Sequence, residues 1–252
     1  HCASSYLSEI RLQTDLAEKM TQIELDQWLK TKSQNEVGYV RQRIKEIRED
    51  DVRQLLQLAL VSAAVESSNV AFCPGTTFYP FRKRDPFSRL FKAKLAAIYE
   101  DLQDLQQVNF GYGKANVFCA DCRKLSGVVN QEVDHIFTSP PYPNDLEYTR
   151  QTRLDLYLLD LAQNMQDVQR IKRQMVKGST KLIFDDSNSA DLVREVPSIQ
   201  EIAEAVERAL EGKKWGWDYP RMIREYFGDM YLVLAEMLKV LRRGSWALLV
   251  VG

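Results

Sequence analysis

The stretch VDHIFTSPPYPN, residues 133–144, joins a short apolar run to three of the chain's eight prolines. An apolar run of this length, bounded by turn residues, is typical of a buried strand. Proline has no backbone N–H and pushes the residue before it toward extended geometry, so Ser139, Pro140 and Pro141 should form a stiff, non-helical segment. We therefore expect a strand at 133–138, followed directly by a loop that can hold a carbonyl group in place.

Strand-like and helix-like patterns alternate from about residue 87 onward. Short apolar runs predict strands at 115–120, 133–138 and 245–251. Helical patterns are expected at 86–107, 145–162, 199–211 and 221–242. This alternation predicts an α/β fold, a parallel sheet with helices on both faces. Ligands bind beyond the carboxyl ends of such strands, where Asp121 and Ser139 stand.

The first part of the chain has a different pattern. Residues 1–70 look helical, because an apolar stripe with a 3.6-residue period runs from Val52 to Ala64. We expect a helical segment at 1–70 and a catalytic region at 71–252. The chain opens with His1 and stops straight after a strand-like run, so we expect the second region to be incomplete at both ends.

Composition bounds the class of protein. Hydrophobic residues make up 45% and charged residues 27% of the 252 residues, and no apolar run approaches the roughly 20 residues of a membrane span. Four irregularly spaced cysteines do not suit a disulfide scaffold, which favours a reducing, cytoplasmic location. The formal net charge is −1, so a nucleic acid would have to be met by a local basic patch.

The loop after residue 138 has the groups that an exocyclic amine on a flat base requires. The Ser139 hydroxyl and the Pro140 carbonyl can accept its two N–H groups, while Tyr142 stacks on the ring. Accepting both protons draws the nitrogen lone pair out of conjugation and aims it at an electrophile. The loop therefore predicts transfer of a group to an amine without a strong general base.

The pentapeptide Thr138-Ser139-Pro140-Pro141-Tyr142 resembles the catalytic loop of the amino-DNA methyltransferases, in which a polar residue precedes Pro-Pro and an aromatic residue. The TSPPY version is commonest in the cytosine-N4 branch. CADCRKL before the loop, NDLEYTRQTRLDLYLL after it and EYFGDMYLVLAEMLKVLRRGSWALLVVG also look like segments of this family, over about 140 residues.

The resemblance implies a Rossmann-like class I methyltransferase sheet and a methyl transfer from S-adenosyl-L-methionine to cytosine N4 or, less favoured, adenine N6. It implies catalytic roles for Ser139, Pro140, Pro141 and Tyr142, and cofactor contacts from Asp121 and Thr138. The substrate would be double-stranded DNA with the target base flipped out, because a paired amine cannot reach a buried cofactor. A cognate restriction endonuclease could act beside it.

The sequence departs from the family in several places. Glu147-Tyr148 stands where Asp-Tyr is usual, and Ala120 precedes Asp121 where glycine is usual. The glycine-rich cofactor loop D-P-F-x-G-x-G-T-T is missing: residues 73–77 echo only its tail, and 111–113 lead into a strand-like run rather than a helix. We therefore expect a fragment that lacks the cofactor loop.

Basic residues gather in two places where DNA could bind. The first is Arg82, Lys83 and Arg84, with Arg89, Lys92 and Lys94 behind them and aromatic residues interleaved. The second is Arg150 and Arg153, which lie about one helical turn apart after the loop. Solvated helix charges and ordinary surface ion pairs are the alternatives for each.

Cys119 and Cys122 form a C-x-x-C without a second pair, so we expect two buried or half-buried thiols and no metal site. Trp215 and Trp217 could form a base wedge, but packing is the expected role.

Two other functions fit the same sequence: a nucleic-acid-binding module that keeps the methyltransferase fold without activity, and an RNA amine methyltransferase.

Overall fold

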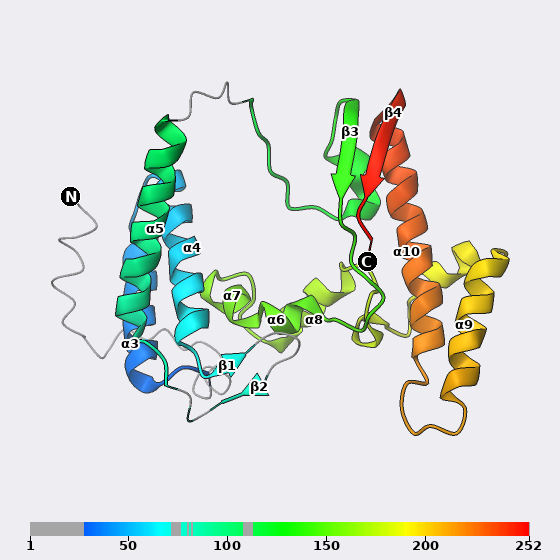
Figure 1. The fold of residues 1–252 in the computed structure, drawn as a ribbon, viewed down its shortest axis with the longest axis horizontal. Helices are drawn as coiled ribbons and strands as arrows, with labels where there is room; N and C mark the ends of the chain where they lie inside the picture. Colours follow the sequence, from blue (N-terminus) through cyan, green and yellow to red (C-terminus); the bar gives the residue numbers. More distant parts are fainter. Residues whose placement is uncertain (1–27, 72–76, 80, 82, 108–112, 252) are drawn as a thin grey trace. The chain divides into compact units, whose positions relative to one another are not determined.

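The computed structural model describes residues 28–71, 77–79, 81, 83–107 and 113–251 of the chain (Figure 1). This part of the protein mixes helices with a small parallel sheet and is an α/β structure. It divides into two compact units, the first formed by residues up to 112 with 149–168, the second by 113–148 with 169–252. The predicted division at residue 70 stays a prediction.

Three long helices make up most of the described part of the first unit, and short elements accompany them. The helices are α3 (Thr31–Lys45), α4 (Asp50–Ser67) and α5 (Phe87–Gln107). Two-residue strands β1 (Val70–Ala71) and β2 (Thr77–Phe78) pair antiparallel. The helical pattern predicted for residues 1–70 is confirmed for α3 and α4, and the expected helix at 86–107 is confirmed by α5; residues 1–27 lie outside the described part.

Residues 145–162 do not form the continuous helix that the sequence predicts. They contain two short helices, α6 (Tyr148–Gln151) and α7 (Arg153–Leu158), which are separated at Thr152. After α7 the chain turns at Asp160, whose φ of +60° is left-handed. The Arg41 guanidinium of α3 donates to the Leu158 carbonyl at 2.8 Å, so the end of α7 is fixed by a side chain 117 positions away.

The second unit is organised around one long helix. It contains η1 (Cys122–Gly127), β3 (Val133–Thr138), η2 (Thr180–Leu182), η3 (Ser189–Val193), α9 (Pro197–Leu210), α10 (Tyr219–Val240) and β4 (Leu241–Leu249), and α8 (Met165–Arg173) leads into it. Helix α10 packs against η1, η3 and α9. The helices expected at 199–211 and 221–242 are confirmed with shifted ends.

The apolar stripe of α10 explains its place on the sheet. Tyr226, Met230, Val233 and Met237 recur with helical spacing and form a buried cluster, against which Ile136 of β3 packs. Because α10 runs directly into β4, the helix and the strand that follows it lie beside β3. This is a strand-to-strand crossover of the α/β type, and it places the carboxyl ends of β3 and β4 side by side.

The two strands pair in parallel, as the sequence predicts for 133–138 and for the run after Gly244. His135 to Thr138 pair in register with Trp246 to Leu249, respectively. β4 already begins at Leu241, but the register shifts after Val133, because Gly244 has a φ of +85° that interrupts regular pairing.

The run at 115–120 is not the buried strand that the sequence predicts. These residues have no regular secondary structure and are exposed; Val117 is 97% and Phe118 56% exposed. A strand needs a neighbour for its backbone hydrogen bonds, and in the described part of the chain β3 pairs with β4 alone.

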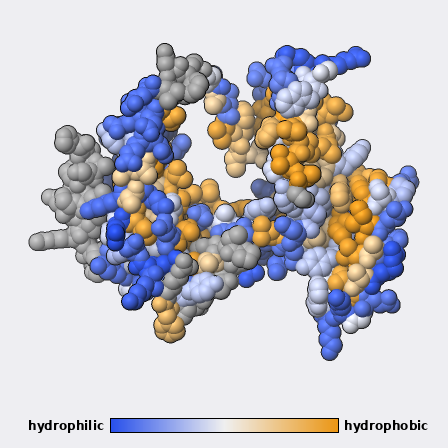
Figure 2. Space-filling model, in the orientation of Figure 1, coloured by the Kyte–Doolittle hydropathy of each residue, from blue (hydrophilic) through white to orange (hydrophobic). Residues whose placement is uncertain are grey.

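The sheet has one covered and one open face. Ile136 faces α10, whereas Phe137 is 72% and Trp246 53% exposed, and His135 stacks on Trp246 with ring centroids 4.3 Å apart. Figure 2 shows apolar side chains gathered over β3 and β4. Within the described residues, helices therefore cover one face of this sheet and not both.

Candidate functional site

The segment Ser139–Asn144 leaves the carboxyl end of β3 as an irregular loop, as its prolines predict. Thr138 ends the strand, and its carbonyl accepts a hydrogen bond of 2.9 Å from the Val250 amide, just beyond β4. Ser139 is exposed, Pro140 is buried, and Pro141 and Tyr142 are half-buried. The predicted catalytic loop thus stands at the edge of the sheet where ligands bind in α/β folds.

The hydroxyl groups of the loop converge on the end of β4. The Ser139 hydroxyl donates to the Val250 carbonyl at 3.3 Å, and the Tyr142 hydroxyl lies 3.5 Å from the same oxygen. The two hydroxyl oxygens are 3.3 Å apart. A serine whose proton is directed to a carbonyl keeps its oxygen lone pairs available to accept from an amine.

The loop is held from the side of α10. The Tyr226 hydroxyl donates to the Pro141 carbonyl at 2.7 Å. Gly178 lies so close to the loop that a Cβ added at this position would stand 2.7 Å from the Tyr142 carbonyl oxygen. Only glycine can therefore occupy position 178 without displacing the loop.

Asp145 anchors the carboxyl end of the loop. Its Oδ1 accepts from the Ser179 hydroxyl at 2.8 Å and from the Thr180 amide and hydroxyl at 2.8 and 2.9 Å, and its Oδ2 accepts from the Tyr219 hydroxyl at 3.1 Å. Burial alone would raise the pKa of this carboxyl, but the hydrogen bonds outweigh it and the pKa is lowered. Asp145 is therefore a carboxylate at neutral pH.

Asp121 lies at the start of η1, where it caps the turn. Its carboxylate accepts from the Arg123 amide at 2.9 Å and from the Arg123 guanidinium at 2.9 to 3.2 Å. Partial burial raises the pKa of Asp121, but the hydrogen bonds and charge of Arg123 lower it by more. Asp121 therefore has a structural role as a cap, and the cofactor contact of Asp121 and Thr138 stays a prediction.

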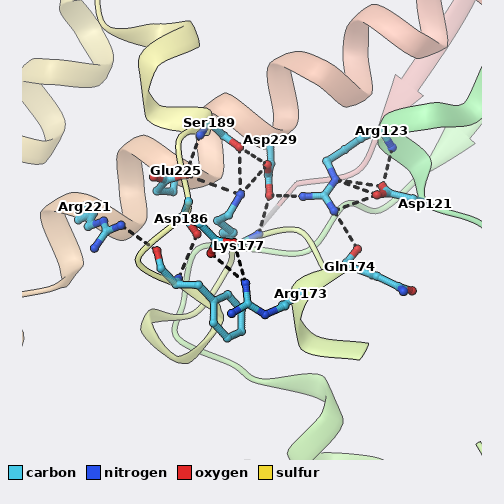
Figure 3. A network of polar contacts seen from close by, with 12 residues as sticks. Asp121, Arg123, Arg173, Gln174, Lys177, Asp186, Ser189, Arg221, Glu225 and Asp229 are labelled. Atoms are coloured by element: carbon cyan, nitrogen blue, oxygen red, sulfur yellow. Dashed lines mark hydrogen bonds and ion pairs between the residues drawn. The ribbon is translucent and has the colours of Figure 1, made fainter. Parts of the chain in front are cut away.

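A buried network continues from Arg123 into the core of the second unit (Figure 3). Asp229 of α10 is fully buried and accepts from Arg123 at 3.0 Å, from the Lys177 ammonium at 3.0 Å and from the Ser189 hydroxyl at 2.6 Å. Glu225, one turn earlier, accepts from the Ser189 amide at 3.0 Å. These contacts tie η1, η3 and the segment before Gly178 to one helix.

The predicted DNA-binding residues are not gathered in the second unit. Lys83 and Arg150 are exposed and Arg84 and Arg153 half-buried, all in the first unit, while Arg82 lies outside the described residues. Two cations of the same patch have acidic partners. Arg89 pairs with Asp85 at 3.0 Å and Lys94 with Glu66 at 2.7 Å, as the alternative of ordinary surface charge expects.

Cys119 and Cys122 are exposed rather than buried; Cys119 lies in the run 115–120, which pairs with no strand among the described residues, and Cys122 begins η1. Desolvation and the nearby Asp121 raise the pKa of Cys122, so its thiol is protonated at neutral pH. Within the described residues, no three His, Cys, Asp or Glu side chains gather as metal ligands.

Trp215 and Trp217 are not packed as expected. Trp217 is 73% exposed, and Trp215 makes an edge contact with Tyr219 at a centroid distance of 6.5 Å while remaining largely exposed.

Sequence reasoning missed the residues that support the loop: Asp145, Gly178, Tyr226 and Asp229. Asp145 follows Pro143-Asn144, and an Asp there could have been read as a turn residue. Tyr226 and Asp229 lie on the apolar face of α10 at positions that periodicity assigns to the core, and a polar atom on such a face is a signal for a buried partner.

The chain is similar to two curated methyltransferases. It is 32% identical over 171 residues to the type II methyltransferase M.AvaI of Nostoc sp. (strain PCC 7120 / SAG 25.82 / UTEX 2576) and, to the same extent, to the protein of that name from Anabaena variabilis. The alignment covers 63% of this chain, which spans about a third of the relatives' length, since 35% of each is covered. No family model and no solved structure matches the chain.

No helix among the described residues has the length and apolar character to cross a membrane.

Proposed function

We propose that the protein takes part in methyl transfer from S-adenosyl-L-methionine to the exocyclic amine of a base flipped out of double-stranded DNA. Cytosine N4 is favoured over adenine N6, because the loop reads TSPPY. The observation that carries the proposal is the Ser139 hydroxyl, exposed at the carboxyl end of a parallel strand with its proton directed to Val250. The similarity to type II methyltransferases supports it.

The roles of the loop follow from its geometry. Ser139 Oγ and the Pro140 carbonyl accept the two amine N–H groups, and the Tyr142 ring stacks on the base. Because the Val250 carbonyl can accept the Ser139 proton, the Ser139 oxygen keeps a lone pair with which it can accept from the amine. This arrangement fits a neutral amine that attacks without prior loss of a proton.

The residues described here fit the base better than the cofactor. S-adenosyl-L-methionine would supply an electrophilic methyl group, but the Asp121 carboxylate is already engaged by Arg123, and the 252 residues contain no glycine-rich cofactor loop. We propose a Rossmann-like class I sheet in which Asp121 and Thr138 lie toward the cofactor. Residues 1–252 alone should bind S-adenosyl-L-methionine weakly or not at all, and micromolar binding in calorimetric titration would contradict this.

The test is methyl transfer by the full-length protein, with mass spectrometry of the digested nucleosides. We expect N4-methylcytosine from duplex DNA, and we expect Ser139→Ala and Tyr142→Ala each to lower the rate about 10²-fold or more. Ser187→Ala, at a serine outside the loop, is the control for hydroxyl removal.

Each alternative has its own outcome in this test. Methylation of RNA but not of DNA would favour the RNA amine methyltransferase. DNA binding without transfer to any substrate would favour the binding module. Near-normal transfer by Ser139→Ala would remove the assigned role of the loop.

DNA contact is proposed for Arg82, Lys83, Arg84, Arg150 and Arg153. Each phosphate contact that is lost should lower the slope of log K against log salt by about one unit. Reversing the charges of Arg82, Lys83 and Arg84 together should flatten that slope in fluorescence anisotropy titrations of duplex DNA. An unchanged slope would assign this patch to solvation. The N4-specific enzyme could act beside a cognate restriction endonuclease.

A further inference from the structure

We propose that Tyr226 and Asp145 are positioning residues that hold the Ser139–Asn144 loop in its active geometry, a role that rests on the proposed function. Tyr226 fixes the middle of the loop through the Pro141 carbonyl, and Asp145 fixes its carboxyl end against residues 178–180. Tyr226 donates to the Pro141 carbonyl, and Asp145 bonds Ser179, Thr180 and Tyr219, so we infer that both act by holding the loop backbone.

The loop needs support from outside because its prolines cannot supply it. Pro140, Pro141 and Pro143 have no N–H group, so backbone donors that would normally anchor a turn are absent from these positions. The carbonyl groups of these prolines remain as hydrogen-bond acceptors. The Tyr226 hydroxyl donates to the Pro141 carbonyl at 2.7 Å, next to the Pro140 carbonyl that is proposed to accept from the amine.

Tyr226 is itself held rigidly. Its side chain is 6% exposed, belongs to the apolar cluster with Met230, and meets Phe227 edge-on with centroids 5.2 Å apart. Burial, followed by the nearby Tyr142 and Tyr148, raises the pKa of its hydroxyl, so it remains a donor at neutral pH. A hydroxyl on a ring that is fixed by packing can hold the position of a carbonyl more precisely than a mobile side chain could.

Asp145 holds the other end in a conformation that most residues avoid. Its φ is +62°, in the left-handed region, where a non-glycine residue is unusual and Asp or Asn is better tolerated. The Asp145 amide donates to the Gly178 carbonyl at 3.0 Å, while its carboxylate accepts from the Ser179 hydroxyl, from the Thr180 amide and hydroxyl, and from the Tyr219 hydroxyl. Five hydrogen bonds therefore fix one residue, and Gly178 allows the same segment to approach Tyr142.

The decisive variant is Tyr226→Phe, which removes one hydroxyl and keeps the packed ring. In the full-length protein we expect kcat for methyl transfer to fall about 10-fold or more, while KM for DNA changes less than about threefold. The matched control is Tyr231→Phe, on the exposed side of the same helix. A purely structural role would lower thermal stability without lowering kcat of the folded enzyme.

A second readout does not depend on activity. Hydrogen exchange at the amides of residues 142 and 144–146 should become at least about 10-fold faster in Tyr226→Phe and in Asp145→Ala, and remain unchanged in Tyr231→Phe. Asp145→Asn, which tolerates the left-handed φ and keeps an acceptor oxygen, should restore most of the protection and most of kcat.

Gly178→Ala gives an independent test, because its Cβ would press on the Tyr142 carbonyl; Gly113→Ala, with open space around it, is the control. We expect Gly178→Ala to lose kcat as Tyr226→Phe does. A wild-type enzyme without methyl transfer would overturn the proposed function. The hydrogen-exchange data would still test whether Tyr226 and Asp145 hold the Ser139–Asn144 loop. An active wild type with unchanged exchange or unchanged kcat in Tyr226→Phe would overturn the positioning role.

Discussion

The runs 115–120 and 133–138 have the same length, and the first contains more apolar residues than the second, yet only the second forms a strand. Residues 133–138 pair with β4 and place Ile136 on the apolar cluster of α10. Residues 115–120 have neither a paired neighbour among the described residues nor a packed face, and Val117 and Phe118 are exposed. The difference shows that an apolar run supplies side chains that a strand could bury. Whether the run forms a strand depends on a neighbouring strand with which it can pair.

The ends of the two runs are nevertheless both fixed to α10. After the first run, Arg123 joins Asp121 to Asp229, and Ser126 donates to Glu236 through its amide at 2.9 Å and its hydroxyl at 2.6 Å. After the second run, Tyr226 holds Pro141. Polar contacts to one helix thus fix the two predicted ligand-side segments independently of the strand pairing before them.

The largest expected effect is the difference in unfolding free energy between a proline substitution in run 133–138 and one in run 115–120. Thr138 directs its carbonyl to Val250 of the neighbouring segment, and Ile136, two residues earlier, directs its backbone groups to the same side. Ile136→Pro should therefore remove a ladder donor and a packed side chain and lower the free energy of unfolding by about 4 kcal/mol or more. Val117→Pro should change it by less than about 0.5 kcal/mol.

Urea unfolding followed by circular dichroism measures both. If Val117→Pro lowered the free energy of unfolding as much as Ile136→Pro does, residues 115–120 would have to pair in solution. The contrast between the two runs would then disappear.

The next effect concerns the helix that holds the ends of both runs. Asp229→Ala leaves the Arg123 and Lys177 charges without their buried carboxylate and should cost about 3 kcal/mol of unfolding free energy. The control is Asp191→Ala, which removes an exposed carboxylate paired with Arg194 and should cost less than about 1 kcal/mol. Equal losses in urea titrations of the two variants would contradict the proposed importance of the buried network.

The smallest effect is a pH dependence at the end of the first run. Hydrogen bonds from Lys239 and then from Ser126 lower the pKa of Glu236 from 4.5 to about 2. A carboxyl with a lowered pKa in the folded state stabilises the protein above its unfolded pKa, and this contribution is lost as the pH falls from about 4.5 toward 2.

Glu236→Gln should therefore flatten the fall in melting temperature over that acid range and leave the profile near pH 7 parallel to that of the wild type. Differential scanning calorimetry across the pH range checks this. An unchanged acid limb would show that the Glu236–Ser126 contact does not anchor η1.

The sequence by itself determined the local features whose cause is local. Proline chemistry determined the loop at 139–144, and the 3.6-residue period of apolar residues determined α4 and α10 within a few positions. The strand at 133–138 also followed from residue types. The amine-accepting character of Ser139 and Pro140 could be stated from their chemistry alone.

Only the tertiary structure decided which apolar runs are paired, which cysteines are exposed, and which side chains support the loop. Tyr226 lies 85 positions after Pro141, and Asp229 lies 106 positions after Arg123, so no sequence window contains either pair. The break between α6 and α7 likewise goes against a continuous helical pattern. The physical reason is that local propensity is worth fractions of a kcal/mol per residue, while buried hydrogen bonds and charge pairs depend on partners that folding brings together.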